Sequence, residues 1–117
     1  MNIHTRTVGD FHILDVSGKI VLGQETKLVR CTIKDLLHNG VKKIVLNLAE
    51  VSYIDSSGVG ELVSSFTSVA KEGGQLGLLN LTNKAREVLA ITKLLTVFQV
   101  YDNEQEALSA GVDGKGP

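Results

Sequence analysis

The sequence lacks an excess of either charge, because its 117 residues include 12 lysines and arginines and 13 aspartates and glutamates. A protein that binds nucleic acid usually shows a basic excess or a basic stripe. The sequence shows neither feature, so we expect no direct contact with nucleic acid.

Long apolar runs are also missing. No run approaches the roughly 20 residues that a membrane-spanning helix needs. The N-terminus lacks the apolar core of a signal peptide. The single cysteine, Cys31, cannot form a disulfide within the chain, which suits a reducing compartment. We therefore expect a cytoplasmic protein that makes no contact with a membrane.

Metal-binding residues are few and scattered. His4, His12, His38 and Cys31 show none of the close ligand spacing that is typical of zinc sites. We expect no metal and no cofactor. Cys31 falls in a predicted helix, where a cysteine is more often a small core residue than a reactive thiol.

The length is that of one domain with its own core. We predict a single domain over residues 1–111 and a disordered tail over residues 112–117, because the glycine-rich end has no apolar periodicity. No second domain, internal repeat or low-complexity segment is evident.

The stretch from Lys43 to Ala70 combines a predicted strand with a predicted helix. Ile44 to Leu48 form a nearly continuous apolar run, as expected for a strand that is covered on both faces. A short connector and the compact turn Asp55-Ser56-Ser57-Gly58 follow. Apolar residues then recur at the spacing of one face of an α-helix, namely Val59, Leu62, Val63, Phe66, Val69 and Ala70.

The N-terminal part predicts a hairpin followed by a helix. Residues 2–8 and 11–17 would pair through a two-residue turn at Gly9-Asp10, which places His4 opposite Asp15. Gly18 and Gly23 bracket a predicted loop. The following helix is expected over residues 24–38, with Asn39-Gly40 as its stop signal.

The C-terminal part predicts further alternation of strands and helices. The expected elements are a strand over 75–81, a helix over 84–92, a strand over 97–101 and a last helix from Asp102 or Asn103 to Ala110. Together with the opening hairpin, this order predicts an α/β fold in which helices pack against a mixed sheet.

The serine turn lies where backbone N–H groups lack partners and the helix dipole is positive. Phosphorylation there would add about 1.5 to 2 negative charges at pH 7. If a partner covered the turn, this charge would be buried beside the Asp55 carboxylate, at a cost of about 3–5 kcal/mol in binding free energy. That cost would weaken binding roughly a hundredfold or more. The plainer interpretation is that Asp55 or a serine only caps the helix and Gly58 only permits the turn. Spacing does not decide which of Ser56 and Ser57 caps the helix and which is exposed.

The stretch from Tyr53 to Gly60, YIDSSGVG, resembles the signature of the STAS domain. More narrowly, it resembles the bacterial anti-sigma factor antagonists, also called anti-anti-sigma factors. The likeness extends over nearly the whole chain, including the Gly73-Gly74 break, LGLLNL at 76–81 and VFQVY at 97–101. The family fold is a small mixed sheet with helices packed against it, in agreement with the predicted order of elements.

The resemblance implies a phosphorylation-switched regulator of transcription and not an enzyme. In this family the serine directly after the aspartate accepts the phosphate, which corresponds here to Ser56. The unphosphorylated protein binds an anti-sigma factor, often a serine protein kinase, and so frees a sigma factor. The kinase ends this interaction by phosphorylating the serine, and a metal-dependent serine phosphatase restores it. We expect a monomer or a weak dimer that serves such partner switching, as in a stress response.

The partner is expected to dock on the turn and on the exposed face of the following helix. Asp55 and Ser57 would shape the helix start, while Gly58 and Gly60 would let a partner approach the backbone closely. The candidate contacts further along the helix are Glu61, Ser64, Ser65 and Ser68.

One segment departs from the family pattern. Many members carry a Gly-x-Leu/Ile-Asp segment after the second strand, in a loop that commonly contributes to partner contact. Here the segment reads Gly18-Lys19-Ile20-Val21, with Val21 in place of the aspartate. The switch would survive, whereas the partner could be a distant relative of the usual kinase or another phosphorylation-responsive regulator.

An enzyme with a serine nucleophile is the first competing interpretation. Such a serine needs a general base within hydrogen-bond reach. Neither Ser56 nor Ser57 lies in a Gly-x-Ser-x-Gly elbow, and His38 should be held some 20 Å away by the intervening strand. His4 and His12 belong to the predicted hairpin, with no evident route to the turn. This interpretation is therefore disfavoured.

A STAS-like module without phosphorylation is the second alternative. It would act as a scaffold, as a subunit of a transport complex or as a nucleotide binder. Gly58 and Gly60 do not form a phosphate-binding loop, because no Gly-Lys-Ser/Thr follows them. The cationic group Lys84, Arg86 and Lys93 is most simply a solvated face, although it could meet an acidic partner.

Overall fold

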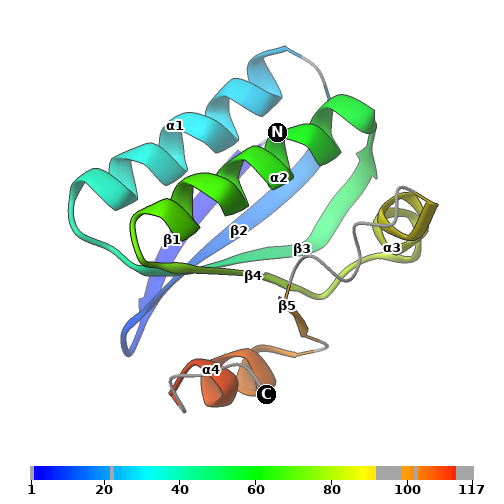
Figure 1. The fold of residues 1–117 in the computed structure, drawn as a ribbon. Helices are drawn as coiled ribbons and strands as arrows, with labels where there is room; N and C mark the ends of the chain where they lie inside the picture. Colours follow the sequence, from blue (N-terminus) through cyan, green and yellow to red (C-terminus); the bar gives the residue numbers. More distant parts are fainter. Residues whose placement is uncertain (1, 22, 92–98, 102, 113–117) are drawn as a thin grey trace.

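The computed structural model describes residues 2–21, 23–91, 99–101 and 103–112. They form five strands and four helices (Figure 1). In chain order these are β1 (Asn2–Val8), β2 (Phe11–Ile20), α1 (Gln24–His38), β3 (Lys43–Ile54), α2 (Ser56–Lys71), β4 (Gln75–Leu79), α3 (Asn83–Ile91), β5 (Gln99–Tyr101) and α4 (Glu104–Val112). No helix in this described part is both long enough and apolar enough to span a bilayer.

The strands form one mixed sheet in the order β1-β2-β3-β4-β5. β1 pairs antiparallel with β2, and the later strands pair in parallel. The predicted hairpin register is confirmed, because Val8 pairs with Phe11 and His4 lies opposite Asp15. The predicted α/β fold with an opening hairpin is therefore confirmed.

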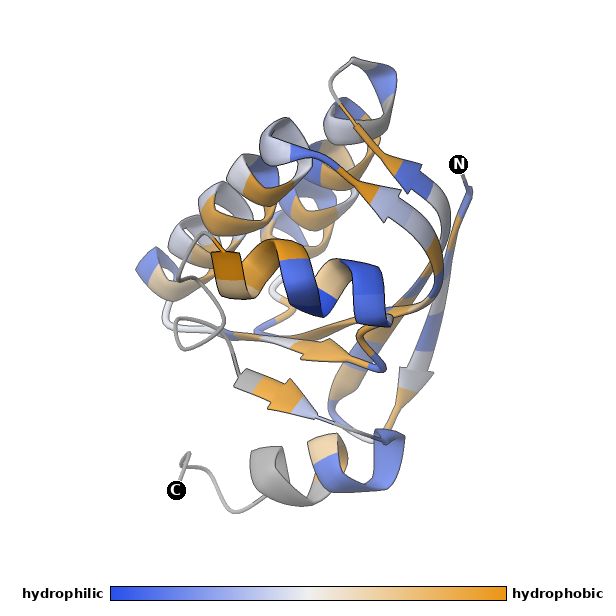
Figure 2. Cartoon of the chain, turned by 90° about the vertical axis from the view of Figure 1, so that its right-hand side faces the viewer, coloured by the Kyte–Doolittle hydropathy of each residue, from blue (hydrophilic) through white to orange (hydrophobic). Residues whose placement is uncertain are grey.

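Helices cover both faces of the sheet. α1 and α2 lie side by side on one face, α4 lies on the opposite face, and α3 packs near the far end of β3 (Figure 1). The larger apolar core, which includes Leu14, Leu46 and Leu78, lies on the α1–α2 side. A smaller core with Phe11 and Val45 lies on the α4 side. In Figure 2 much of the inner part of the sheet is coloured hydrophobic, whereas the strand that begins at the N-terminus is mainly blue and white.

β2 and β3 are longer than the sequence pattern predicts. The expected loop after Gly18 and the expected connector after Leu48 are both wrong, since β2 continues to Ile20 and β3 continues to Ile54. Leu48, Val51 and Ile54 are spaced by three, which does not fit the alternation of a regular strand.

Two register shifts resolve this misfit. Along the β2–β3 pairing, one extra β3 residue falls between Asn47 and Glu50 and another between Val51 and Tyr53. Each extra residue restores the alternation. Leu48, Val51 and Ile54 thus all reach the α1–α2 core, although their spacing hides the strand.

Most other predicted boundaries hold to within a few residues. α1 has the predicted bounds, and Gly40 after it has a φ of 85°. β4 ends at Leu79 and not at residue 81, because Asn80 turns the chain with a φ of 57°. Residues 92–98, where a helix end and a strand start are expected, lie outside the described residues.

Two predictions near the surface and the C-terminus need correction. Cys31 is exposed and is not a core residue. α4 runs to Val112, so residue 112 belongs to a helix and not to the predicted tail. Asn103 caps α4 by accepting a 2.8 Å hydrogen bond from the Glu106 backbone N–H. Asp102, the other predicted cap, and residues 113–117 are outside the described part.

Candidate functional site: the start of α2

The predicted serine turn joins the end of β3 directly to α2. Asp55 has extended backbone angles, and its side chain accepts a 2.8 Å hydrogen bond from the Gly58 N–H. The Asp55 carbonyl also accepts a 2.9 Å bond from the Val59 N–H. Asp55 is therefore the N-cap of α2, which decides between the aspartate and the two serines.

The turn is also attached to the end of β2. The Asp55 N–H donates a 3.3 Å hydrogen bond to the Ile20 carbonyl. A Cβ built on Gly58 would lie 2.2 Å from the same Ile20 oxygen and 2.8 Å from an Ile54 side-chain carbon. Gly58 is buried, so its missing side chain leaves room for the chain's own backbone. The prediction that Gly58 lets a partner approach the backbone is therefore wrong.

Gly60 has the opposite environment. It is exposed, and a Cβ at this position would meet nothing within 4 Å. The structure thus separates two glycines that the sequence treats alike. Gly58 is needed for internal packing, whereas Gly60 leaves a bare patch on the outer surface of α2.

The two serines of the turn differ in exposure. Ser56, the first residue of α2, is exposed, whereas Ser57 is half-buried. The Ser56 hydroxyl is consequently the more accessible of the two. It lies within the first helical turn, where N–H groups and the helix dipole favour an anion.

Glu61 does not lie on the exposed face where it was predicted. It is only 4% exposed, and its Oε1 accepts hydrogen bonds of 2.7 and 3.1 Å from the Arg30 guanidinium on α1. Ser65, another predicted contact, is also buried and donates a 3.4 Å hydrogen bond to Glu61. The hydrogen bond to Glu61 is the main cause that raises the pKa of Arg30.

The helical periodicity of α2 does not predict the contact between Glu61 and Arg30. Glu61 and Ser65 flank the apolar face of α2, and only the position of α1 covers them. Arg30, next to the buried Val29 on α1, is the one residue that could have suggested a buried acidic partner. Ser64 is exposed as predicted, and Ser68 is half-buried.

None of the three histidines lies beside the serine turn. His12 is near the start of β2 and Ile20, which contacts the turn, is at its end, a separation of about 26 Å for an extended strand. His38 is at the end of α1, where it shares a hollow with Ser68 and Glu72 at the far end of α2. His4 lies opposite Asp15 in β1. Among the described residues, no group of three or more histidine, cysteine or acidic side chains could hold a metal.

A polar network that the sequence did not suggest lies on the α4 side of the sheet. Arg6 binds Asp15 through two hydrogen bonds and reaches Glu104 of α4 at 2.8 Å. Asn47 donates to Asp15 at 2.8 Å, and Asn80 donates to Asn47 at 3.2 Å. The hydrogen bond from Arg6 is the main cause that lowers the pKa of Asp15.

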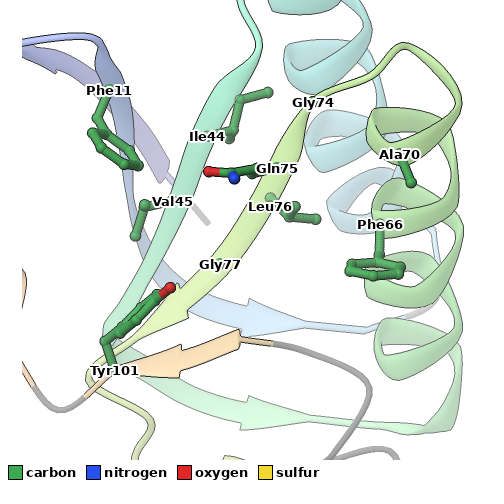
Figure 3. A pocket seen from close by; sticks show the side chains of 10 residues that line it. All are labelled: Phe11, Ile44, Val45, Phe66, Ala70, Gly74, Gln75, Leu76, Gly77 and Tyr101. Atoms are coloured by element: carbon green, nitrogen blue, oxygen red, sulfur yellow. The ribbon is translucent and has the colours of Figure 1, made fainter. Parts of the chain in front are cut away.

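A cavity of about 190 Å³ lies around the start of β4, from Gly74 to Gly77, away from the serine turn. Figure 3 shows Phe66 and Ala70 of α2 on one side of β4, with Phe11, Val45 and Tyr101 on the other. None of the ten lining residues belongs to the predicted site.

Comparisons with known proteins come from sequence and from structure. A family model for the STAS domain matches residues 2–107. A Thermotoga neapolitana homologue of the protein TM1081, provisionally named an anti-sigma factor antagonist, is 36% identical over 74 residues. This match covers 63% of the chain and 66% of that relative, so it spans slightly less than two thirds of the relative's length.

Two solved proteins share the fold over nearly the whole chain. The crystal structure of Thermotoga maritima TM1081 has a TM-score of 0.84 and 29% identity, covering 92% of each chain. The anti-sigma factor antagonist SpoIIAA, in its unphosphorylated form, has a TM-score of 0.72 and 21% identity, covering 97% of this chain and 99% of its own. Bacillus SpoIIAA has also been solved in a phosphorylated form. At this identity the likeness to SpoIIAA concerns the fold alone.

Proposed function

Because this chain belongs to the STAS domain family, we propose that it is an anti-sigma factor antagonist whose binding is switched by phosphorylation of Ser56. In the unphosphorylated state it binds an anti-sigma factor and thereby releases a sigma factor. Phosphate on Ser56 ends this binding. Relatives such as the Thermotoga neapolitana protein and SpoIIAA are named anti-sigma factor antagonists, which supports the proposal.

The observation that carries the proposal is the exposed Ser56 hydroxyl in the first turn of a capped helix. A kinase can reach this hydroxyl without unfolding the turn. The new phosphate would stand next to the Asp55 carboxylate, which is already committed to the Gly58 N–H. A partner pressed against the turn would have to desolvate both charges, and this cost would expel it.

The proposed contact surface is one stripe on α2. Ser56, Gly60 and Ser64 are all exposed and lie four residues apart, which puts them on the same side of the helix. Ser57 lies beside this stripe. The other predicted site residues support this stripe from inside the protein. Asp55 caps the helix, Gly58 packs against Ile20, and Glu61 forms an ion pair that joins α2 to α1.

The loop after β2 would border this surface. Val21 directly follows Ile20, whose carbonyl touches both Asp55 and the space above Gly58. Val21 stands where many family members carry an aspartate, so this chain offers the partner an apolar contact in place of a charge. We infer that its anti-sigma factor differs from the usual kinase at the matching position.

The proposed cycle needs two further proteins in the cytoplasm. A serine protein kinase, which is the anti-sigma factor itself or a relative of it, transfers the phosphate. A metal-dependent serine phosphatase removes it. The chain itself is not proposed to be an enzyme, because none of its histidines lies beside either serine of the turn.

A capture experiment tests the proposal. The chain, Ser56→Ala and Ser56→Asp are immobilised and exposed to the native cytoplasm, and captured proteins are identified by mass spectrometry. We expect wild type and Ser56→Ala to retain an anti-sigma factor, and Ser56→Asp to lose it at least about a hundredfold. Ser57→Asp is the matched control, with the same charge on the neighbouring residue.

Phosphate transfer is tested with the captured partner and ATP. Wild type should gain one phosphate, Ser57→Ala should gain it too, and Ser56→Ala should gain none. A STAS scaffold without a switch would remain unmodified in every case. Tight binding of the anti-sigma factor by Ser56→Asp would contradict the charge-exclusion mechanism.

A further inference from the structure

β1 lies at one edge of the sheet. It pairs with β2 on one side, and no strand in the described part of the chain pairs with its other side. Figure 2 shows this strand running down the outside of the molecule from the N-terminus. The opposite edge is β5, which has only three residues, whereas β1 has seven. β1 is therefore the longer of the two edge strands.

β1 has few of the features that protect edge strands in natural proteins, which include proline, lysine, a bulge or a covering segment. Its sequence, NIHTRTV, contains neither proline nor lysine, and its pairing with β2 has no register shift. Arg6 carries its one permanent charge, and this guanidinium is already bound by Asp15 and Glu104. The edge can therefore accept a further strand.

The hairpin turn decides which backbone groups of β1 face outward. Val8 and Phe11 flank a two-residue turn, so they form a hydrogen-bonded pair. Hydrogen-bonded and non-hydrogen-bonded pairs alternate along an antiparallel ladder. The even-numbered residues of β1 therefore direct their backbone N–H and C=O groups to β2. Those of Ile3, Thr5 and Thr7 point away from the sheet, where an added strand could bind them.

A second copy of β1 fits this edge. If Thr5 pairs antiparallel with Thr5 of the second copy, Ile3 lies opposite Thr7, and every outward N–H meets a carbonyl. Three such pairs make about six hydrogen bonds around a single two-fold axis. The facing side chains are all β-branched, which is a favourable combination for neighbouring strands. A pairing between β1 and β5 would be shorter, because β5 has three residues. The two-fold pairing is therefore favoured over an open chain of copies.

Charge does not oppose this register. On the α4 side of the sheet, His4 would lie opposite Arg6 of the second copy. Both residues are next to acidic groups of their own chains, because Asp15 pairs with His4 and binds Arg6, which also contacts Glu104. No uncompensated like charges therefore meet where the two strands join.

An exposed apolar side chain on α1 lies above the same edge. Leu28 is 40% exposed, and it is two residues before Arg30, which binds Glu61 on α2. Residues two apart lie on opposite sides of a helix, so Leu28 faces away from α2. Because α1 packs on β2 while α2 packs on β3 and β4, this side of α1 is the side of β1. The approach of a second α1 would shield Leu28 from water.

We propose that this chain forms a weak two-fold dimer in which the β1 strands of two copies pair antiparallel, with Thr5 on the axis. The two five-stranded sheets become continuous. This inference goes beyond the proposed switch and does not depend on it. The stripe of Ser56, Gly60 and Ser64 lies on α2, which packs on β3 and β4, so both copies keep this surface open. The dimer presents two such surfaces to any partner that is itself dimeric.

Sedimentation equilibrium of the whole chain measures the association. We expect a dissociation constant between about 10 µM and 1 mM, since one strand pairing is a small interface. Thr5→Pro removes the outward N–H on the axis, which makes no bond to β2, and should weaken dimerisation at least about tenfold. Thr5→Lys keeps that N–H but brings two ammonium groups together, and should weaken it about fivefold.

Thr67→Lys is the matched control for charge. It adds the same group on the exposed surface of α2 and should change dimerisation less than about twofold. Urea unfolding of the dilute variants checks that each monomer folds.

Cross-linking tests the register. In a Cys31→Ser background, Thr5→Cys should readily form an intermolecular disulfide, because the two Cα atoms would be about 5.5 Å apart. Thr7→Cys is the matched control, since residue 7 is also exposed. Its two copies would be separated by four strand residues, or about 13 Å, which is beyond the reach of a disulfide. We expect at least about tenfold less covalent dimer from Thr7→Cys.

A chain that remains monomeric at about 1 mM would overturn the proposal. So would equal cross-linking at positions 5 and 7, or dimerisation that neither Thr5 substitution weakens. Ser56→Asp should dimerise within about twofold of wild type. Loss of dimerisation in that variant would place the interface at the serine turn and would also overturn the β1 pairing. None of these measurements involves a kinase or an anti-sigma factor, so a failure here leaves the proposed Ser56 switch intact.

Discussion

The two faces of the sheet are held by different chemistry. On the α1–α2 face, apolar side chains from the sheet, α1, α2 and α3 meet in the larger core, and the start of α2 packs against Ile20 without spare volume. The α4 face has a smaller apolar core and, in addition, the charged row of Arg6, Asp15 and Glu104. The serine turn adjoins the first face, so its position depends on close packing, whereas α4 is attached both by a small apolar core, which includes Ala107, and by charged side chains.

The largest effect is expected at Gly58. Gly58→Ala should lower the free energy of unfolding by about 3 kcal/mol, because the new Cβ would lie 2.2 Å from the Ile20 carbonyl oxygen. Urea denaturation measures this loss. Gly60→Ala is the matched control, and it should raise the stability by about 0.5 kcal/mol or more, since alanine favours the helix. Similar effects at both positions would show that packing at the turn is loose.

The ion pair between α1 and α2 is the second test of the packed face. Glu61→Gln keeps the size of the side chain but removes its charge, and we expect a loss of about 1.5 kcal/mol in the free energy of unfolding. Glu87→Gln, on the exposed surface of α3, should be nearly neutral. If Glu61→Gln were also neutral, the pair would not hold the two helices together.

The polar row is the corresponding test of the α4 face. Arg6→Leu should cost about 1 kcal/mol near neutral pH, because it removes the bonds to Asp15 and Glu104. Asp15→Asn completes a double-mutant cycle that isolates the Arg6–Asp15 contribution. Denaturation midpoints of the four proteins give the coupling.

The same variants predict a dependence on pH. Arg6 lowers the pKa of Asp15 in the folded state, so the Asp15 contribution is complete above the unfolded value near 3.9 and is lost as pH falls through the folded value. The stability difference between wild type and Arg6→Leu should therefore shrink below about pH 4. A difference that grows on acidification would contradict this assignment.

The smallest effect is expected at the cap of α4. Asn103→Ala removes the acceptor of the Glu106 N–H and should cost about 0.5 kcal/mol, at the low end for caps because α4 is terminal. Hydrogen exchange should report faster opening of α4 with little change in α2. Equal acceleration in both helices would mean that the two faces unfold together.

Much of the fold was predictable because it follows from local rules. α1 has an apolar face and a glycine stop, and the hairpin register follows from its two-residue turn. The long ends of β2 and β3 were not predictable. Two extra residues in β3 shift the register, and such shifts arise from pairing with β2 and not from the β3 sequence itself.

The candidate site divides in the same way. The Asp-Ser-Ser-Gly turn was recognisable as a helix start, and its likeness to a known family pointed to Ser56. The roles of the neighbours were not recognisable, because Glu61 is covered by α1 and Gly58 by the end of β2. Both contacts join residues that are more than thirty positions apart in the chain.

The sequence by itself determined that a serine-bearing helix start follows a buried strand, because periodicity and capping act over a few neighbouring residues. Only the tertiary structure decided that Ser56 is exposed, that Asp55 supplies the cap and that Gly60, but not Gly58, is accessible to a binding partner. The physical reason is that exposure depends on which distant segments cover a residue, and in this chain α1 and the end of β2 provide that cover.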